Sequence, residues 1–215
     1  MAELPPTVPL KVLYLGHSFV RRISDYIDLH PTHLNFGLSS STHDIHFIGR
    51  PGGHARHLAR AFPAVLELAP DLVFLDIGTN DLTVMHPQEL FSQVMATARG
   101  LVNTCGVKTV VLLQVLPRTV EGRFGQPAEF QTKVEQYNNI IQSNVYHQKF
   151  IDPVYNVPST PITYWFHRGF RSDIGSLIVD GVHLNQTGLP LYIKSLKRAI
   201  LRFSPEVRRQ LALSS

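Results

Sequence analysis

Two nearly continuous apolar runs, LVFLDI at 72–77 and TVVLLQ at 109–114, constrain the fold of this 215-residue chain more than any other feature. A strand that faces solvent on one side alternates apolar and polar residues, whereas a strand buried on both faces is apolar almost throughout. Strands of the second kind occur in parallel sheets that are covered by helices on both faces. The two runs therefore predict a parallel sheet inside an α/β fold.

Segments with strand character alternate with segments of helical periodicity along the chain. The expected strands are, in chain order, Lys11–Leu15, Asp44–Ile48, Leu72–Ile77, Thr109–Gln114 and Phe150–Asp152. The expected helices are Val20–Asp28, Ala55–Leu68, Pro87–Thr104, Ala128–Tyr146 and about Gly188–Phe203. This alternation predicts a doubly wound α/β fold.

Length and composition predict one domain over residues 1–215, with its core at about 10–203. No apolar stretch approaches the roughly 20 residues of a membrane span. The N-terminal MAELPPTVPLK lacks the basic start and apolar block of a secretory signal. The single cysteine, Cys105, has no intrachain disulfide partner and is interpreted as a small core residue. An intracellular location, cytoplasmic by default, is therefore expected.

The formal net charge is +4 and the sequence pI is about 9.3, so the chain is mildly basic. The densest group of cations lies near the C-terminus and consists of Lys194, Lys197, Arg198, Arg202, Arg208 and Arg209. We interpret these charges as the solvated face of a closing helix. Binding to nucleic acid would require the same charges to gather on one face without acidic neighbours.

The segment from Pro153 to Ile178 has weak periodicity and many aromatic and turn residues. Long irregular segments inside a compact domain are usually functional or disordered, and the aromatic content argues against disorder. The expected structure is a loop over or beside the active site, and a cluster packed on the flank of the domain is the alternative.

Four polar motifs follow the predicted strands or precede the last helix. They are GHS at 16–18, GRPGGHA at 49–55, GTND at 78–81 and DGVHLN at 180–185. In a parallel sheet the ligand crevice lies outside the carboxyl ends of the strands. The four motifs are therefore expected to meet at one edge of the sheet.

These motifs contain complementary chemical groups. A serine hydroxyl such as that of Ser18 needs a base to take its proton, and His183 is the candidate. Asp180, three residues earlier, would orient the imidazole and stabilise its protonated form. The Ser18 N–H, a glycine N–H of the second motif and the Asn80 side chain would stabilise an oxyanion.

Each motif taken alone has a purely structural explanation. Serine at a strand-to-helix junction is a common N-cap, as Ser18 would be. Gly52 and Gly53 would mark a turn, Asn80 a turn or cap, and Asp180 the start of another turn. Since all four motifs come together at successive strand ends, the catalytic interpretation is favoured.

The ordered set GHS, GRPGG, GTND and DGVH resembles the SGNH hydrolase superfamily, also called GDSL-like esterases and lipases, over about Lys11 to Phe203. The resemblance implies a flavodoxin-like three-layer α/β/α fold with a sheet of five parallel strands. It also implies a metal-independent serine hydrolase, without a cofactor, that acts on esters or thioesters. The nucleophile does not lie in G-x-S-x-G, so the α/β-hydrolase elbow is excluded.

The resemblance assigns roles residue by residue. It implies Ser18 as nucleophile, His183 as base, Asp180 as its orienting partner, and the Ser18 N–H, Gly53 and Asn80 as the oxyanion hole. The doubled glycine leaves Gly52 as an alternative to Gly53.

His17 departs from the family pattern, which usually has aspartate at this position. The change puts the hydrogen bonding of the Ser18 turn in question. Neither His17 nor His54 has a carboxylate close to it in sequence as His183 does, so both rank below His183 as the base.

The expected reaction is a two-step acyl transfer through an acyl-enzyme, with a small-molecule, lipid or other acylated ester as substrate. Acetylated sugars, lysophospholipids, thioesters and short-chain esters all remain open, and so does the oligomeric state. The alternative from another class is a catalytically weak ligand-binding module, which His17 motivates. A domain of a mobile-element protein is the context considered for such a module. Nucleic-acid binding ranks third.

Overall fold

The computed structural model describes residues 8–119, 127–146, 161–170 and 174–214, and at its centre is a five-stranded sheet. The strands are β1 (Leu10–Gly16), β2 (His43–Gly49), β3 (Leu72–Asp76), β4 (Thr109–Leu113) and β5 (Ile162–Trp165). Their spatial order is β2-β1-β3-β4-β5, and every neighbouring pair is parallel. The predicted sheet of five parallel strands is confirmed.

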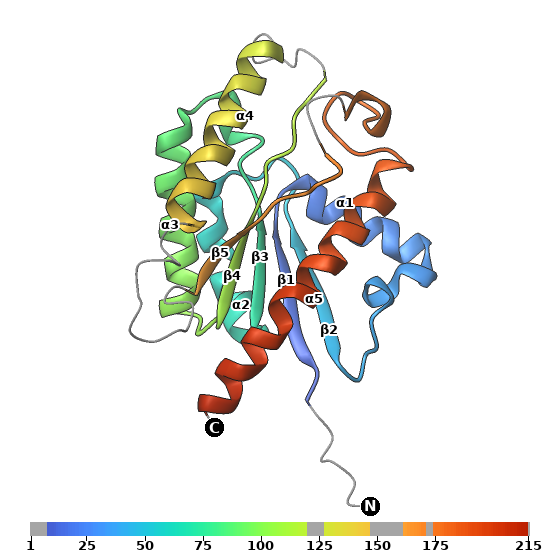
Figure 1. Ribbon diagram of the computed structural model, residues 1–215, viewed down its shortest axis with the longest axis vertical. Coiled ribbons are helices and arrows are strands. Elements are labelled where there is room, and N and C mark those ends of the chain that lie inside the picture. The colour runs from blue at the N-terminus through green and yellow to red at the C-terminus, as the bar shows by residue number, and fades with distance from the viewer. Residues whose placement is uncertain (1–7, 120–126, 147–160, 171–173, 215) are drawn as a thin grey trace, which may run out of the picture.

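Helices cover both faces of this sheet, as Figure 1 shows. They are α1 (Ser18–Leu29), α2 (Phe62–Leu68), α3 (Pro87–Asn103), α4 (Pro127–Ile141) and α5 (Gly188–Ser214). Side chains of α1 and α5 belong to one core cluster, and side chains of α2, α3 and α4 belong to the other. The fold is therefore the expected three-layer α/β/α arrangement.

Neighbouring residues of each central strand pack into opposite cores. In β3, Phe74 packs on the side of α1 and α5, whereas Val73 packs on the side of α3 and α4. Every residue of β3 and of β4 is buried. Burial on both faces explains why these two strands are apolar with almost no interruption.

The fifth strand lies where the sequence predicted a loop. β5, with the sequence ITYW, pairs with β4 from Val110 opposite Ile162 to Leu113 opposite Trp165. The expected loop structure is therefore wrong for this part of Pro153–Ile178. The strand predicted at Phe150–Asp152 lies outside the described residues. A four-residue strand at the edge of a sheet is too short to show a period of two.

Three of the predicted helices, Ala55–Leu68, Ala128–Tyr146 and Gly188–Phe203, have other ends in the structure. Residues Ala55–Ala61 form 3₁₀ turns before α2 begins, and a π-helical turn, Gln142–Tyr146, follows α4. The last helix continues past Phe203 and Pro205 to Ser214. Phe203 and Val207 are both buried at helical spacing, so the apolar stripe extends through the proline.

In the described part of the chain, none of the helices combines the length and the apolar character needed to cross a membrane.

Candidate active site

The site begins where β1 ends, at a glycine that allows a close approach of two strands. A Cβ atom at Gly16 would overlap the backbone carbonyl oxygen of Asp76 at the end of β3. The N–H of the next residue, His17, donates to that same oxygen at 3.2 Å. The chain then enters α1 at once, which places Ser18 at the first helical position and at the carboxyl edge of the sheet.

Ser18, His183 and Asp180 form one chain of hydrogen bonds. The Oγ atom of Ser18 lies 2.8 Å from Nε2 of His183, although the two residues are 165 positions apart. The Nδ1 atom of His183 lies 2.7 Å from Oδ2 of Asp180. The structure thus brings together the three residues that the sequence predicts as catalytic, in the order nucleophile, base and orienting carboxylate.

The Asp180 carboxylate is held by its own loop. Its Oδ1 atom accepts hydrogen bonds from the N–H of Val182 at 3.1 Å and of His183 at 2.7 Å. Burial alone would raise the pKa of Asp180, but the hydrogen bonds from His183 and Val182 outweigh it and lower the pKa to about 2. An ionised Asp180 takes the Nδ1–H of His183, which leaves Nε2 as the acceptor that faces the Ser18 hydroxyl.

His17 is buried and caps α1 from within the turn. Its Nδ1 atom accepts a hydrogen bond from the Phe19 N–H at 3.2 Å, and its Nε2 atom lies 3.5 Å from Oδ1 of Asp76. Burial first, and then the nearby charges of Arg118 and His183, lower the pKa of His17 to about 3. At neutral pH the His17 ring is therefore uncharged, and its contact with Asp76 is not a pairing of two charges.

Asp76 lies beneath the Ser18 turn and is equally buried. Burial raises the pKa of its carboxyl group to about 7, against a lowering by the hydrogen bond from Tyr192. The hydroxyl of Tyr192 donates to Oδ2 of Asp76 at 2.9 Å. This carboxyl group therefore connects β3, α5 and the turn that carries Ser18.

Gly53 and Asn80 lie together at the same edge. The Nδ2 atom of Asn80 donates to the Gly53 carbonyl at 3.0 Å. A Cβ on Gly53 would lie 3.7 Å from the Cα of His17, whereas a Cβ on Gly52 would have open space around it. Gly53 is thus the glycine that adjoins the turn at His17 and Ser18. Its N–H donates to the Arg50 carbonyl at 2.9 Å and closes a turn.

Asp81, the last residue of GTND, anchors the loop that contains Gly53. Its Oδ1 atom accepts from the N–H of Ala55 at 3.1 Å and lies 3.2 Å from Nδ1 of His54. His54 therefore has a carboxylate partner in space, which the sequence did not indicate. In the described residues, however, His183 is the histidine that contacts Ser18.

Arg118 is a residue of this edge that the sequence analysis missed. It follows β4, and its guanidinium donates to Oγ1 of Thr79 at 3.0 Å, to the Thr79 carbonyl at 2.8 Å and to Oδ1 of Asn80 at 3.2 Å. The polar motifs predicted to form the site follow the first three strands and precede the last helix. The same rule applied to QVLPRT after β4 would have found Arg118.

In the described ranges, no three His, Cys, Asp or Glu side chains are grouped so that they could hold a metal ion. That the chemistry needs neither metal nor cofactor stays a prediction.

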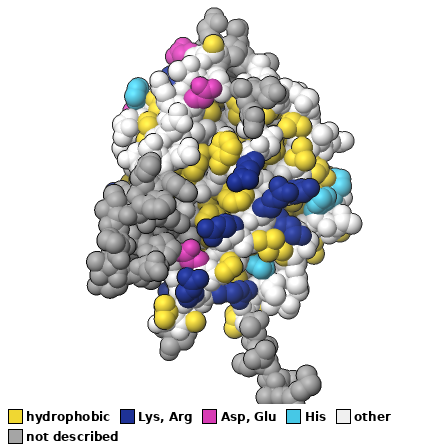
Figure 2. Space-filling view, viewed as in Figure 1, with side chains coloured by type: hydrophobic (Ala, Val, Ile, Leu, Met, Phe, Trp, Pro, Cys, Tyr) yellow, Lys and Arg dark blue, Asp and Glu magenta, His cyan; other side chains and the backbone are white. Residues whose placement is uncertain are grey.

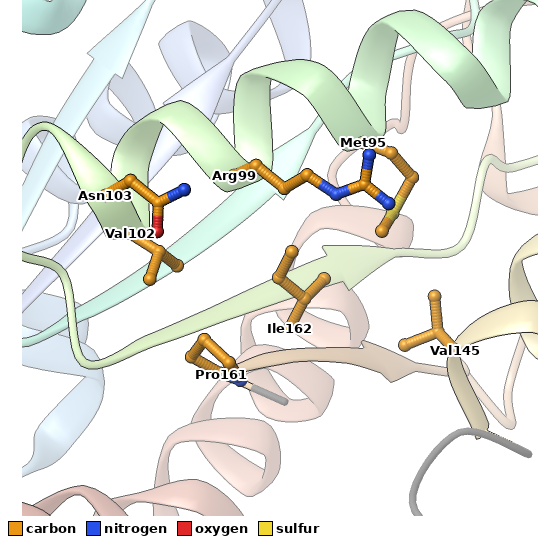
Figure 3. Close-up of a pocket in the computed structure, with 7 residues that line it drawn as sticks. All are labelled: Met95, Arg99, Val102, Asn103, Val145, Pro161 and Ile162. Carbon is orange, nitrogen blue, oxygen red and sulfur yellow. The ribbon is translucent and has the colours of Figure 1, made fainter. Parts of the chain in front are cut away.

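A cavity of about 320 Å³ lies away from these residues, and Figure 3 shows its lining. Its walls come from the end of α3, the π-helical turn and the start of β5, and they include Arg99, Val145 and Ile162. This is the amino edge of the sheet, opposite Ser18. The cavity is therefore not a binding site for a group that reacts at Ser18.

A sequence profile described as the GDSL-like Lipase/Acylhydrolase family matches residues 14–189 of the chain. The match includes Ser18, Gly53, Asn80, Asp180 and His183. No curated protein matches the chain.

Several solved structures share the fold at low sequence identity. A GDSL-like lipase from Bacteroides thetaiotaomicron has a TM-score of 0.67 and 18% identity, with 93% of this chain and 92% of that chain covered. An acetyl esterase mutant with an acetate ion has a TM-score of 0.60 and 18% identity, with 92% and 99% covered. A carbohydrate esterase of family 3 from Talaromyces cellulolyticus has a TM-score of 0.57 and 19% identity, with 90% and 97% covered.

Proposed function

The chain belongs to the GDSL-like lipase/acylhydrolase family, and on that premise we propose that it is a serine esterase which hydrolyses carboxylic esters. One observation carries the proposal: the 2.8 Å contact between Ser18 Oγ and His183 Nε2, continued by the 2.7 Å contact from His183 to Asp180. A nucleophile, a base and a third group that orients the base are the parts that acyl transfer requires.

In the first step, Ser18 Oγ bonds to the ester carbonyl carbon while His183 Nε2 takes the hydroxyl proton. The tetrahedral intermediate then expels the alcohol, which leaves with the proton returned by His183. In the second step, a water molecule gives a proton to His183 and attacks the acyl-enzyme. The acid is released, and Ser18 regains its proton.

The negative charge on the carbonyl oxygen needs donors near Ser18. The Ser18 N–H suits this role because the first N–H groups of a helix have no intrahelical acceptor, and the N-terminal end of α1 favours negative charge. Asn80 Nδ2 carries two hydrogens, of which one goes to Gly53. The Gly53 N–H would have to leave or share the Arg50 carbonyl to become a third donor.

Acetyl esters are the first substrates to examine. The acetyl esterase and the carbohydrate esterase among the similar structures support this choice, since both names denote ester hydrolysis. An acyl-chain series of p-nitrophenyl esters, from acetate to palmitate, identifies the acyl length that the site accepts.

The experiment that tests the proposal compares wild type with Ser18→Ala on p-nitrophenyl acetate. We expect kcat to fall by a factor on the order of 10⁶, as for other complete triads. A fluorophosphonate probe should label wild type at Ser18 and leave the variant unlabelled. Hydrolysis that persists in Ser18→Ala, or wild type that neither labels nor hydrolyses, would leave a ligand-binding module as the better interpretation.

A separate surface supports a second candidate function, the binding of single-stranded nucleic acid. A groove of about 1150 Å³ lies between β5 and α5, and its described lining contains four cations and no acidic residue. The cations are Arg168, Lys194, Arg198 and Arg202. Figure 2 shows Lys and Arg side chains gathered over α5 among apolar side chains, and the acidic side chain visible between them is not part of the described lining of the groove.

The arrangement of the groove fits a strand of phosphates and bases. Lys194, Arg198 and Arg202 are four residues apart, so they repeat about every 6 Å along the helix. None of them forms an ion pair with a described residue. Phe166 lines the same groove and is 47% exposed, which leaves its ring open for stacking on a base.

Fluorescence anisotropy with a labelled oligo(dT) tests this second function. We expect affinity to fall steeply with salt, and Arg198→Gln/Arg202→Gln to weaken binding and to reduce the logarithmic salt slope by about 0.7 for each lost phosphate contact. The control, Arg56→Gln/Arg60→Gln, removes the same charge from another, exposed segment. Equal weakening by both pairs, or binding to anionic vesicles instead of the oligonucleotide, would contradict the assignment.

A further inference from the structure

Arg118 lies behind the Asn80 amide, on the side away from Gly53. It donates to Asn80 Oδ1 at 3.2 Å, while Asn80 Nδ2 donates to the Gly53 carbonyl at 3.0 Å. A guanidinium group can only donate and a carbonyl oxygen can only accept. The two partners therefore allow one orientation of the amide, with its NH₂ group on the side of Gly53 and the Ser18 turn.

From this geometry we propose that Arg118 is a positioning residue for oxyanion stabilisation and acts through Asn80. The inference rests on the proposed esterase function, since it assigns a role within the same site. Without Arg118, the hydrogen bond to the Gly53 carbonyl would be the remaining contact among the described residues that orients the amide, and a half-turn of the amide would present its oxygen to the developing oxyanion. An acceptor in that place would repel the negative charge that a donor stabilises.

The Arg118 side chain is itself fixed. Two of its hydrogen bonds go to Thr79, the residue before Asn80, and its Cζ atom lies 4.7 Å above the centre of the Phe130 ring on α4. The next residue, Thr119, donates its backbone N–H to the Gly181 carbonyl at 3.0 Å. This segment after β4 thus joins the Asn80 loop to the loop that contains Asp180.

Arg118 also remains a cation at the pH of catalysis. Burial lowers the pKa of its guanidinium to about 10, while the Asp180 carboxylate opposes that shift. A hydrogen bond from a cation to Asn80 Oδ1 draws electron density toward the amide oxygen, which makes the Nδ2–H a stronger donor. Orientation and polarisation both act through the one amide group.

A double-mutant cycle with Asn80 tests whether the effect passes through the amide. On p-nitrophenyl acetate we expect Arg118→Met to lower kcat by about 10- to 100-fold with little change in KM. This loss is smaller than the roughly 10²- to 10³-fold fall in kcat that follows removal of an oxyanion donor itself. In an Asn80→Ala background, the same substitution should change kcat by less than about threefold. Equal losses in the two backgrounds, or a loss confined to KM, would overturn the proposal.

Two further variants separate orientation from charge and from folding. Arg118→Lys keeps the cation but loses the planar fork that holds Thr79 and Asn80 together, so kcat should stay below wild type; full activity would contradict the positioning role. If thermal denaturation shows that Arg118→Met does not fold, Arg118→Lys provides the test in its place. Arg22→Met removes a cation 3.5 Å from Asp180 that has no contact with Asn80, and it should lower kcat by less than about fivefold.

The outcomes distinguish this inference from the function on which it rests. Ser18-dependent hydrolysis by wild type together with an unchanged Arg118→Met contradicts the role of Arg118 alone. If the wild-type protein shows no Ser18-dependent hydrolysis, both the esterase function and the role of Arg118 are contradicted. A loss in Arg22→Met as large as that in Arg118→Met would assign the effect to the local positive charge and overturn the role of the amide.

Discussion

The Nδ1 atom of His17 accepts a hydrogen bond from the backbone N–H of Phe19 at 3.2 Å, so a buried imidazole caps the helix that begins with Ser18. Oxygen atoms of Ser, Thr, Asp or Asn usually fill this role. An unprotonated ring nitrogen offers an equivalent acceptor, and burial keeps it unprotonated by lowering the pKa of His17 to about 3. The departure from the family pattern thus preserves the turn.

The cap of α1 can be isolated by comparing two substitutions of His17. Both His17→Ala and His17→Asn remove the ring and leave a cavity, but asparagine retains an acceptor for the Phe19 N–H. We expect His17→Ala to lower the free energy of unfolding by about 1 kcal/mol more than His17→Asn does. Urea denaturation measures the difference, and equal values for the two variants would show that the ring does not act as a cap.

His17 and Asp76 make opposite contributions to the pH dependence of stability. Burial raises the pKa of Asp76 to about 7, so between about pH 4 and 7 folded Asp76 keeps a proton that the unfolded chain releases. Its contribution to the free energy of unfolding is therefore lost as pH rises. Folded His17 lacks a proton that the unfolded chain binds between about pH 3 and 6.5, so its contribution grows as pH rises.

Asp76→Asn should expose the contribution of His17. The amide keeps an acceptor for the Tyr192 hydroxyl but no longer titrates. Between about pH 4 and 6.5, we expect the free energy of unfolding of this variant to rise with pH more steeply than that of wild type, by about 1.4 kcal/mol per pH unit. Urea denaturation at several pH values measures it, with exposed Asp28→Asn as a control that should run parallel to wild type.

Asp180→Asn tests the proposed role of Asp180, which is to orient His183. The amide can still accept the backbone N–H groups of Val182 and His183, so the loop should keep its shape. We expect kcat on p-nitrophenyl acetate to fall by about 10⁴, because a neutral partner no longer selects the productive tautomer of His183. Asp25→Asn, which removes an acid from α1 and its pair with Arg21, provides the matched control. A fall below about tenfold would contradict the triad assignment.

Substitutions at the doubled glycine separate its two members. A Cβ at Gly53 would lie 2.9 Å from the Arg50 carbonyl oxygen, so the loop beside Ser18 would have to shift. A displacement of 1 Å in a site lowers the reaction rate by about 10²-fold. Gly52 has φ of +65° and open space, so alanine there adds backbone strain of about 1–2 kcal/mol. We expect Gly53→Ala to lose kcat, and Gly52→Ala to lose stability with kcat retained. The reverse pattern would assign the site glycine to Gly52.

The strands buried on both faces were predictable from sequence, and the edge strand β5 was not. β3 and β4 lie in the middle of the sheet, where burial demands an unbroken apolar run. β5 has four residues, of which two are only partly buried, and prolines precede it. Its pairing with β4 depends on contacts across about 50 residues of chain, which no local pattern records.

The candidate site also contains residues that the sequence predicted and residues that it did not. The rule that polar residues after parallel strands meet at one edge selects Ser18 and Asn80. Asp180 and His183 are selected as a motif before the last helix, and the choice of Gly53 over Gly52 comes from the family resemblance. The roles of His17 and Asp76 do not follow from that rule, because they depend on which buried groups face each other. His17 supplies an acceptor through its ring, and Asp76 becomes visible as a partner only when α5 brings Tyr192 against it.

The 165 positions between Ser18 and His183 have a consequence for synthesis of the protein. At roughly 5–20 residues per second, the ribosome needs on the order of ten seconds to add His183 after it has added Ser18. Throughout that interval Ser18 lacks the base that the proposed mechanism assigns to it. In the proposed mechanism, the Ser18 hydroxyl of the growing chain is therefore unreactive until the loop before α5 docks beside the start of α1.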